Sequence, residues 1–127
     1  MPPIPKTNVV FFQLARGEVP LLQWLNDPKI HNAKSVKRFH ERVDLLAMRG
    51  EALKRPYADY LRDGIRELRF HWGHKQYRVL YSFVGRKVVL LTHGITKEQK
   101  VPEQEIDRAL LFREIYLENP VEHTYIG

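Results

Sequence analysis

The sequence places four side chains suited to phosphate chemistry close together: Glu67, Arg69, Arg78 and His93. They lie in segments rich in β-branched and aromatic residues, a composition typical of β-strands. Adjacent strands are about 4.8 Å apart, so side chains on one face of such a sheet can converge on a single group. The three segments are residues 65–72, 76–84 and 87–95.

Two glycines set the expected register of these strands. Gly73 and Gly85 each begin a predicted two-residue hairpin loop. Arg69 then lies opposite Arg78, and Arg78 lies opposite His93. Two arginines directly across a ladder repel each other, so this pairing suggests that an anion lies between them in use. Because strand side chains alternate, the other face is the predicted core, formed by Leu68, Phe70, Tyr77, Val79, Tyr81, Phe83, Val88 and Leu90.

These groups match the needs of RNA cleavage by attack of a 2′-oxygen on the adjacent phosphorus. The reaction needs proton transfer and positive charge against the developing phosphorane. His93 could act as acid or base, while Arg69 and Arg78 would grip the phosphate through their planar guanidinium groups. Glu67 lies two residues before Arg69 and could orient an arginine or act as the base. This chemistry requires no metal.

The charge of the chain favours a polyanionic partner. The net charge is +6 and the pI is about 9.7. Residues 62–100 hold nine Lys and Arg against three acidic residues, which predicts that the positive excess lies on the sheet. Counterion release favours nucleic acid over an acidic metabolite. Arg66, Lys97 and Lys100 are the further predicted contacts to RNA.

Each of these residues also has a structural interpretation. Arg69 and Arg78 could be solvated strand residues paired with a nearby carboxylate. His93 could simply bond a backbone carbonyl. The two lysines, Lys97 and Lys100, could be solvated loop residues.

The other histidines and aromatic residues have weaker functional claims. His71, His74 and His93 together could suggest zinc, but no acidic or thiolate partner completes the set, so no metal is predicted. Three aromatic residues are expected to pack in the core rather than stack on bases: Trp72, Tyr77 and Tyr81.

Helices are predicted on either side of these strands in the sequence. Apolar residues recur every three or four positions over residues 32–49, which predicts an amphipathic helix. A last helix is expected to begin at Pro102, with acidic residues near its N-terminus. The other expected features are a strand at 8–13, a helical turn or two at 19–26, an extended crossing at 51–63 and an irregular tail from about 118.

Length and composition limit the class of protein. The 127 residues, 43% of them hydrophobic, suffice for one domain, expected to span 1–127. The absence of cysteine excludes disulfides and thiolate metal sites, and fits a reducing compartment. No apolar stretch approaches membrane-spanning length, so a cytoplasmic location is expected.

Three linked motifs resemble the RelE/HigB toxin superfamily, in particular its phage-derived HigB-like branch. They are ELR at 67–69, YRVLYSF at 77–83 and VVLLTHGITKEQKVPEQEIDRA at 88–109. The resemblance implies an α+β, RelE-like fold of the microbial ribonuclease type, with N-terminal helices packed on a small antiparallel sheet and a C-terminal helix. It also implies a metal-independent endoribonuclease that cuts messenger RNA on the ribosome, without a cofactor.

The same resemblance implies roles for single residues. Arg69 and Arg78 occupy the motif positions that hold RNA phosphates, and His93 and Lys97 match an HG-x-x-K pattern. The chain departs from this branch at Glu98, where a second lysine is common, and the next lysine is Lys100. A noncatalytic RNA- or ribosome-binding module of the same fold is therefore the alternative function.

The resemblance further implies a cognate antitoxin, with a helix-turn-helix type as the expected one. The antitoxin is expected to cover the basic sheet or to displace the last helix. That helix, residues 103–117, is predicted to cap Leu80, Val89 and Leu91.

Overall fold

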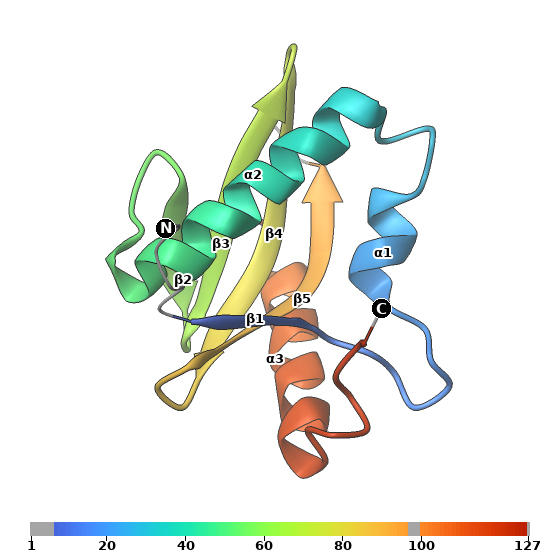
Figure 1. Cartoon of the computed structure of the whole chain (residues 1–127), viewed down its shortest axis with the longest axis vertical. Coiled ribbons are helices and arrows are strands. Elements are labelled where there is room, and N and C mark those ends of the chain that lie inside the picture. Colours follow the sequence, from blue (N-terminus) through green and yellow to red (C-terminus); the bar gives the residue numbers. More distant parts are fainter. Residues whose placement is uncertain (1–6, 97–99, 127) are drawn as a thin grey trace, which may run out of the picture.

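The computed structural model of the protein describes residues 7–96 and 100–126. It contains a five-stranded sheet with helices on both faces (Figure 1). The elements in chain order are β1 (Asn8–Phe11), α1 (Pro20–Leu25), α2 (Ala33–Arg49), the short 3₁₀ helix η1 (Gly50–Ala52), β2 (Ala58–Arg62), β3 (Ile65–Trp72), β4 (Lys75–Val84), β5 (Val88–Thr96) and α3 (Glu103–Glu118). The predicted α+β class is confirmed. Within the described residues, no helix is long and apolar enough to cross a membrane.

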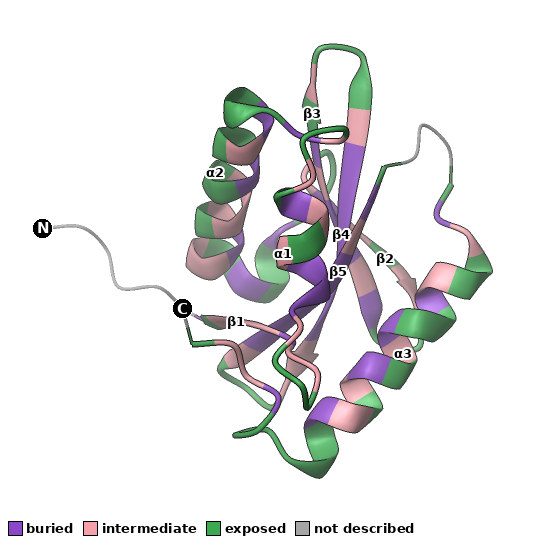
Figure 2. Ribbon diagram, turned by 90° about the vertical axis from the view of Figure 1, so that its right-hand side faces the viewer, coloured by how far each residue is buried: buried purple, intermediate pink, exposed green. Residues whose placement is uncertain are grey.

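The strand order in the sheet is β1-β5-β4-β3-β2. Strands β2 to β5 are antiparallel, as expected, whereas β1 pairs parallel with β5. The expected extended crossing at 51–63 contains η1 and also supplies β2, an edge strand. Helices α1 and α2 cover one face of the sheet and α3 covers the other (Figure 2).

Helix α2 begins where the sequence provides a cap. The Asn32 side chain accepts hydrogen bonds from the backbone N–H groups of Lys34 and Ser35, both at 2.9 Å. The Ser35 hydroxyl in turn accepts from the Asn32 N–H at 3.0 Å, which completes a capping box. Phe39 and Leu46 lie on the buried side of the helix.

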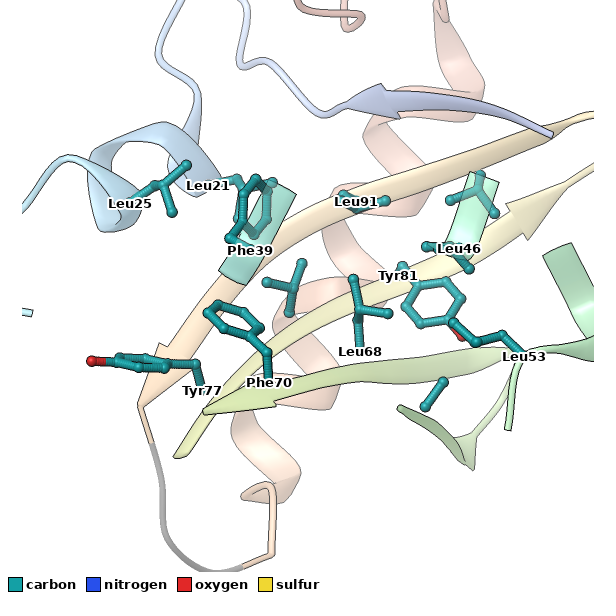
Figure 3. Packing of buried hydrophobic residues seen from close by; sticks show 13 residues of the cluster. Leu21, Leu25, Phe39, Leu46, Leu53, Leu68, Phe70, Tyr77, Tyr81 and Leu91 are labelled. Atoms are coloured by element: carbon teal, nitrogen blue, oxygen red, sulfur yellow. The ribbon is translucent and has the colours of Figure 1, made fainter. Parts of the chain in front are cut away.

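The main core lies between the sheet and helices α1 and α2 (Figure 3). Its large members are Leu21, Leu25, Phe39, Leu46, Leu53, Leu68, Phe70, Tyr77, Val79, Tyr81, Val89 and Leu91. The members from β3 and β4 were predicted from alternation. Those from β5 were not, since the prediction placed Val88 and Leu90 on this face.

The loop between β4 and β5 explains this error. The first hairpin has the predicted two-residue loop, with Trp72 paired to Lys75 and Arg69 paired to Arg78. In the second hairpin Val84 pairs with Val88, so the loop has three residues. One extra residue moves the β5 side chains nearest the loop, from Val88 to Leu91, to the opposite face.

A β-bulge near the middle of β5 shifts the register again. Leu80 pairs with His93 and Tyr81 pairs with Leu91, so Thr92 is the extra residue on β5. The Thr92 hydroxyl donates to the Leu80 carbonyl at 3.2 Å. The predicted pairing of Arg78 with His93 is therefore wrong. His93 nevertheless lies on the same face as Arg78, because the bulge offsets the longer loop.

Helix α3 packs on the second face of the sheet. Its buried residues Ile106 and Ala109 contact the cluster of Ile65, Leu80 and Ile95. Further along the helix, Phe112 and Tyr116 pack with Phe12 and Leu90. The helix caps Leu80 as predicted, but Leu90 takes the place of Val89 and Leu91, which belong to the main core.

The chain after α3 returns to the edge of the sheet. Thr124 forms a bridge with Phe12, the Gln13 N–H donates to the His123 carbonyl at 2.9 Å, and the Tyr125 N–H donates to Phe11 at 2.9 Å. The tail from residue 119 to 126 therefore borders β1 although it forms no helix.

Candidate functional site

A buried carboxylate lies at the centre of the predicted site. Glu67 on β3 has a side chain only 3% exposed. The Arg78 guanidinium donates to both Glu67 oxygens, at 3.1 and 3.0 Å, and Arg69 Nε lies 3.6 Å from Oε1. Glu67 thus contacts both opposed arginines and offsets their repulsion, while the anion expected between them in use stays a prediction.

The two arginines differ in their access to solvent. The side chain of Arg78 is 10% exposed, whereas that of Arg69 is 29% exposed. The three charges sum to one net positive charge on this face. Arg69 is consequently the member of the trio that can contact a phosphate in the observed arrangement. Arg78 is bound to Glu67 in the interior.

His93 lies beneath α3 and is 2% exposed. Its ring packs edge-to-face on Phe112 with the centroids 5.7 Å apart. The Thr92 hydroxyl donates to the Leu80 carbonyl, and its oxygen lies 3.2 Å from His93 Nδ1. On the other side of the ring, Nε2 lies 3.5 Å from Glu105 Oε1.

Burial lowers the pKa of His93 from 6.5 to about 4, with a smaller contribution from the charge of Arg108. The imidazole is therefore neutral at pH 7. With α3 in place no substrate reaches it. Its predicted role in proton transfer stays a prediction, and it requires α3 to move.

A histidine that the sequence analysis assigned no catalytic role lies in a better position. His71 follows Arg69 by two residues on β3, so both side chains lie on the same face, and His71 is exposed opposite Gln76. The alternation that grouped Arg69 with Glu67 was sufficient to find it.

A pocket wraps around the edge of β3 beside these residues. Its lining includes Arg69, His71 and Gln76 from the hairpin, and Arg42 and Tyr57 from the opposite side of the sheet. Arg42 donates to the backbone carbonyl of Arg69, and its guanidinium lies over the Tyr57 ring, 4.6 Å from the centroid. Arg42 is a site residue that sequence reasoning missed, because only the fold brings α2 to this strand.

The other predicted RNA contacts lie elsewhere. Arg66 pairs with Tyr81, which places it on the α2 side of the sheet, against the rings of Tyr60 and Phe83 at 5.6 and 5.4 Å. Lys100 is exposed just before α3. Lys97 lies outside the described residues.

The positive excess of residues 62–100 was predicted to lie on the sheet, and in the described chain its strand residues lie on both faces of the sheet. Arg62 is neutralised by Asp63, Glu103 and Asp107 at 2.8, 2.7 and 2.6 Å. Arg86 lies in the β4–β5 loop, at the end of the sheet opposite the β3–β4 loop.

Cations gather instead around Trp72, near the tip of the first hairpin. Lys34 Nζ and the Arg38 guanidinium lie over the indole ring, 5.2 and 5.9 Å from its centroid. Trp72 packs partly against the main core, as predicted, and is otherwise half-buried. In the described part of the chain, no group of three His, Cys, Asp or Glu is placed to hold a metal.

One comparison with known proteins places the chain in a family. No curated protein matches the sequence. The family described as "Phage derived protein Gp49-like (DUF891)" matches residues 29–112, from the loop before α2 into α3. The match contains Glu67, Arg69, Arg78 and His93. Since it spans more than half of the sequence, the chain belongs to the phage-derived Gp49-like family, which includes toxin-like proteins of toxin–antitoxin systems.

Proposed function

We propose that this protein is the toxin of a type II toxin–antitoxin system and cleaves messenger RNA at the ribosome. The observation that carries the proposal is the pair of opposed arginines around Glu67 in a Gp49-like protein. Arg69 reaches solvent from this cluster, beside the exposed His71. A cation and an imidazole on one open face are suited to phosphodiester cleavage without a metal.

Each residue has a distinct role in this mechanism. Arg69 binds the scissile phosphate and offsets the charge of the phosphorane. Glu67 orients the arginines, because its oxygens are already occupied by Arg78 and it is buried from substrate. His71 transfers a proton to or from the reacting oxygens, with His93 as the second candidate if α3 is displaced on the ribosome.

The test is single-turnover cleavage of messenger RNA on programmed ribosomes. Arg69→Ala should lower the cleavage rate by about 10² or more, because the lost charge acts mainly in the transition state. Lys87→Ala, which removes an exposed cation at the far end of the sheet, is the matched control. Products should carry 2′,3′-cyclic phosphate or 3′-phosphate ends, and EDTA should not slow the reaction.

Two histidine variants separate the proton-transfer candidates. His71→Gln should slow cleavage by about 10² to 10⁴ while leaving RNA affinity nearly unchanged. His93→Gln should then leave the cleavage rate within a few fold. The reverse pattern would transfer the role to His93 and would require that α3 moves during the reaction.

The noncatalytic RNA- or ribosome-binding module is the second candidate function. It is favoured by the burial of His93, the histidine of the HG-x-x-K motif. In that case the parent protein binds RNA with strong salt dependence, about −0.7 in log–log slope for each phosphate contact, and yields no new RNA ends.

A cognate antitoxin, expected to carry a helix-turn-helix domain, is part of the proposal. Leu111 and Leu117 on α3 are 53% and 54% exposed, which supports this helix as the contact surface. Growth arrest on expression should be relieved by co-expression of the neighbouring gene. Harmless high-level expression of the parent protein alone would contradict the toxin assignment.

A further inference from the structure

Three basic residues form a row along α2 that the mechanism above does not use. Lys34, Arg38 and Arg42 follow one another at four-residue spacing, so they lie on one side of the helix, about 6 Å apart along its axis. Like charges at this spacing destabilise a helix. The row therefore has a cost to folding that an anionic partner would remove.

The row lies beside the outer edge of β3. At one end Arg42 donates to the Arg69 carbonyl, and at the other end Lys34 and Arg38 contact Trp72. Strand β2 pairs with β3 as far as Leu68, and the Arg69 N–H donates to the Tyr57 carbonyl at 2.7 Å. Beyond Arg69, no strand of the described chain covers the outer edge of β3. The basic row thus runs along an open edge from the candidate site to the hairpin tip.

Two further cations extend this surface at the tip. Lys29 and Lys75 line a pocket with Trp72 and His74. Within the described residues, no carboxylate lies within 4.0 Å of the ammonium groups of Lys29, Lys34 or Lys75. Arg38 pairs with the exposed Glu41 at 3.7 Å, so the positive charge on this surface that is open to an external anion is mainly that of the lysines.

Trp72 gives the row a fixed geometry. Two cations over one indole ring lose side-chain freedom before any ligand binds, since cation–π contacts hold them in place. A row of fixed charges that ends beside an aromatic ring is suited to the backbone of a flexible single strand. An acidic protein surface has no regular phosphate spacing to match it.

We propose that the basic row of Lys34, Arg38 and Arg42 binds the backbone of single-stranded RNA and leads it around the β3 edge to Arg69. This inference rests on the proposed function, because it names how the RNA substrate is held away from the reacting phosphate. It places the contact on α2, on the face of the sheet opposite α3.

The test uses a 2′-O-methyl RNA of about ten nucleotides, a length within the site sizes of single-strand binding proteins. This analogue cannot be cleaved by 2′-oxygen attack, so binding is measured without catalysis. The variant Lys34→Gln/Arg38→Gln is compared with Arg86→Gln/Lys87→Gln, which removes the same charge from the exposed β4–β5 loop. Circular dichroism checks that both variants remain folded.

The row variant should bind about tenfold or more weakly at low salt, and its log–log salt slope should be smaller by about 1.4, the value for two phosphate contacts. The loop variant should bind nearly as the parent does. Equal losses in both variants, or none in the row variant, would overturn the proposal. So would a polyglutamate peptide of equal charge that competes as well as RNA.

The same experiment separates the row from the catalytic proposal. If the parent protein binds the analogue through the row but cleaves no RNA on ribosomes, the catalytic proposal is wrong and the row is still an RNA-binding surface. If the row variant binds the analogue with full affinity, the row does not bind RNA, whether or not the parent protein cleaves RNA.

Discussion

At the scale of single residues, two buried histidines make the stability of the fold depend on pH. His31 stacks on Tyr77 with the ring centroids 4.5 Å apart, and His93 lies under α3. Burial lowers the pKa of each from 6.5 to about 4. Between these pH values the unfolded chain binds protons that the folded chain does not, so stability rises with pH.

We therefore expect the free energy of unfolding to be highest above about pH 6.5 and to fall towards about pH 4, by up to about 3 kcal/mol for His93 and by less for His31. Urea denaturation across this range measures it. The difference between wild type and His93→Gln isolates one histidine from the carboxylates that also titrate. His40→Gln, at an exposed position, is the control. Parallel pH curves for wild type and His93→Gln would contradict the expectation.

The sequence predicted part of the candidate site at the level of single residues. Glu67, Arg69 and Arg78 were grouped correctly, because alternation and a two-residue loop fix their relation within one hairpin. The burial of His93 follows from the predicted cap of the last helix on Leu80, which shares its face. The reach of Arg42 was not predictable in this way, because only the fold brings α2 to the edge of β3.

At the scale of elements, the contact between α1 and β5 depends on a glycine. A Cβ atom added at Gly94 would overlap the ring of Trp24, so the absence of a side chain lets α1 lie directly on the strand. Gly94 belongs to the family-like HG-x-x-K motif. Its role in this structure is packing rather than chemistry.

Gly94→Ala should lower the free energy of unfolding by about 1–3 kcal/mol, because the Trp24 ring must shift to admit the methyl group. The measurement is chemical denaturation of the single and double variants. In a Trp24→Ala background the same change should cost much less, since the two residues are in direct contact. An undiminished cost in that background would show that the strain arises elsewhere.

The register of the second hairpin, between β4 and β5, could not be predicted from the sequence. Gly85 has a φ of 62°, a conformation that glycine supplies equally in two-residue and three-residue loops. The sequence therefore could not separate the two loop lengths. The bulge at Thr92 was also invisible, since it arises from the pairing of two strands rather than from either alone.

At the scale of the whole molecule, the tail holds the edge of the sheet. Residues 119–126 bridge to the segment that follows β1, and the His123 ring stacks on Phe12 with the centroids 5.7 Å apart. The sequence predicted an irregular tail, and its polar residues did not indicate these contacts. The parallel pairing of β1 was missed for a similar reason, since a strand of four residues does not specify its neighbour.

Removal of residues 119–127 should lower the free energy of unfolding by about 2 kcal/mol, because two backbone hydrogen bonds to the β1 edge are lost. Urea denaturation provides the measurement. A shorter deletion of residues 126–127 is the control, because Ile126 is 89% exposed. Equal stability of the long deletion and the control would mean that the tail adds nothing to the edge.

The position of β1 also bears on how the protein is made. Asn8 leaves the ribosome early, yet its strand partner Val88 follows much later, and the bridge to Phe12 waits for Thr124. Contacts so distant in sequence form late, because the intervening chain must first be synthesised. The edge of the sheet is thus complete only after the segment up to Thr124 has emerged, and a shorter nascent chain lacks the finished fold.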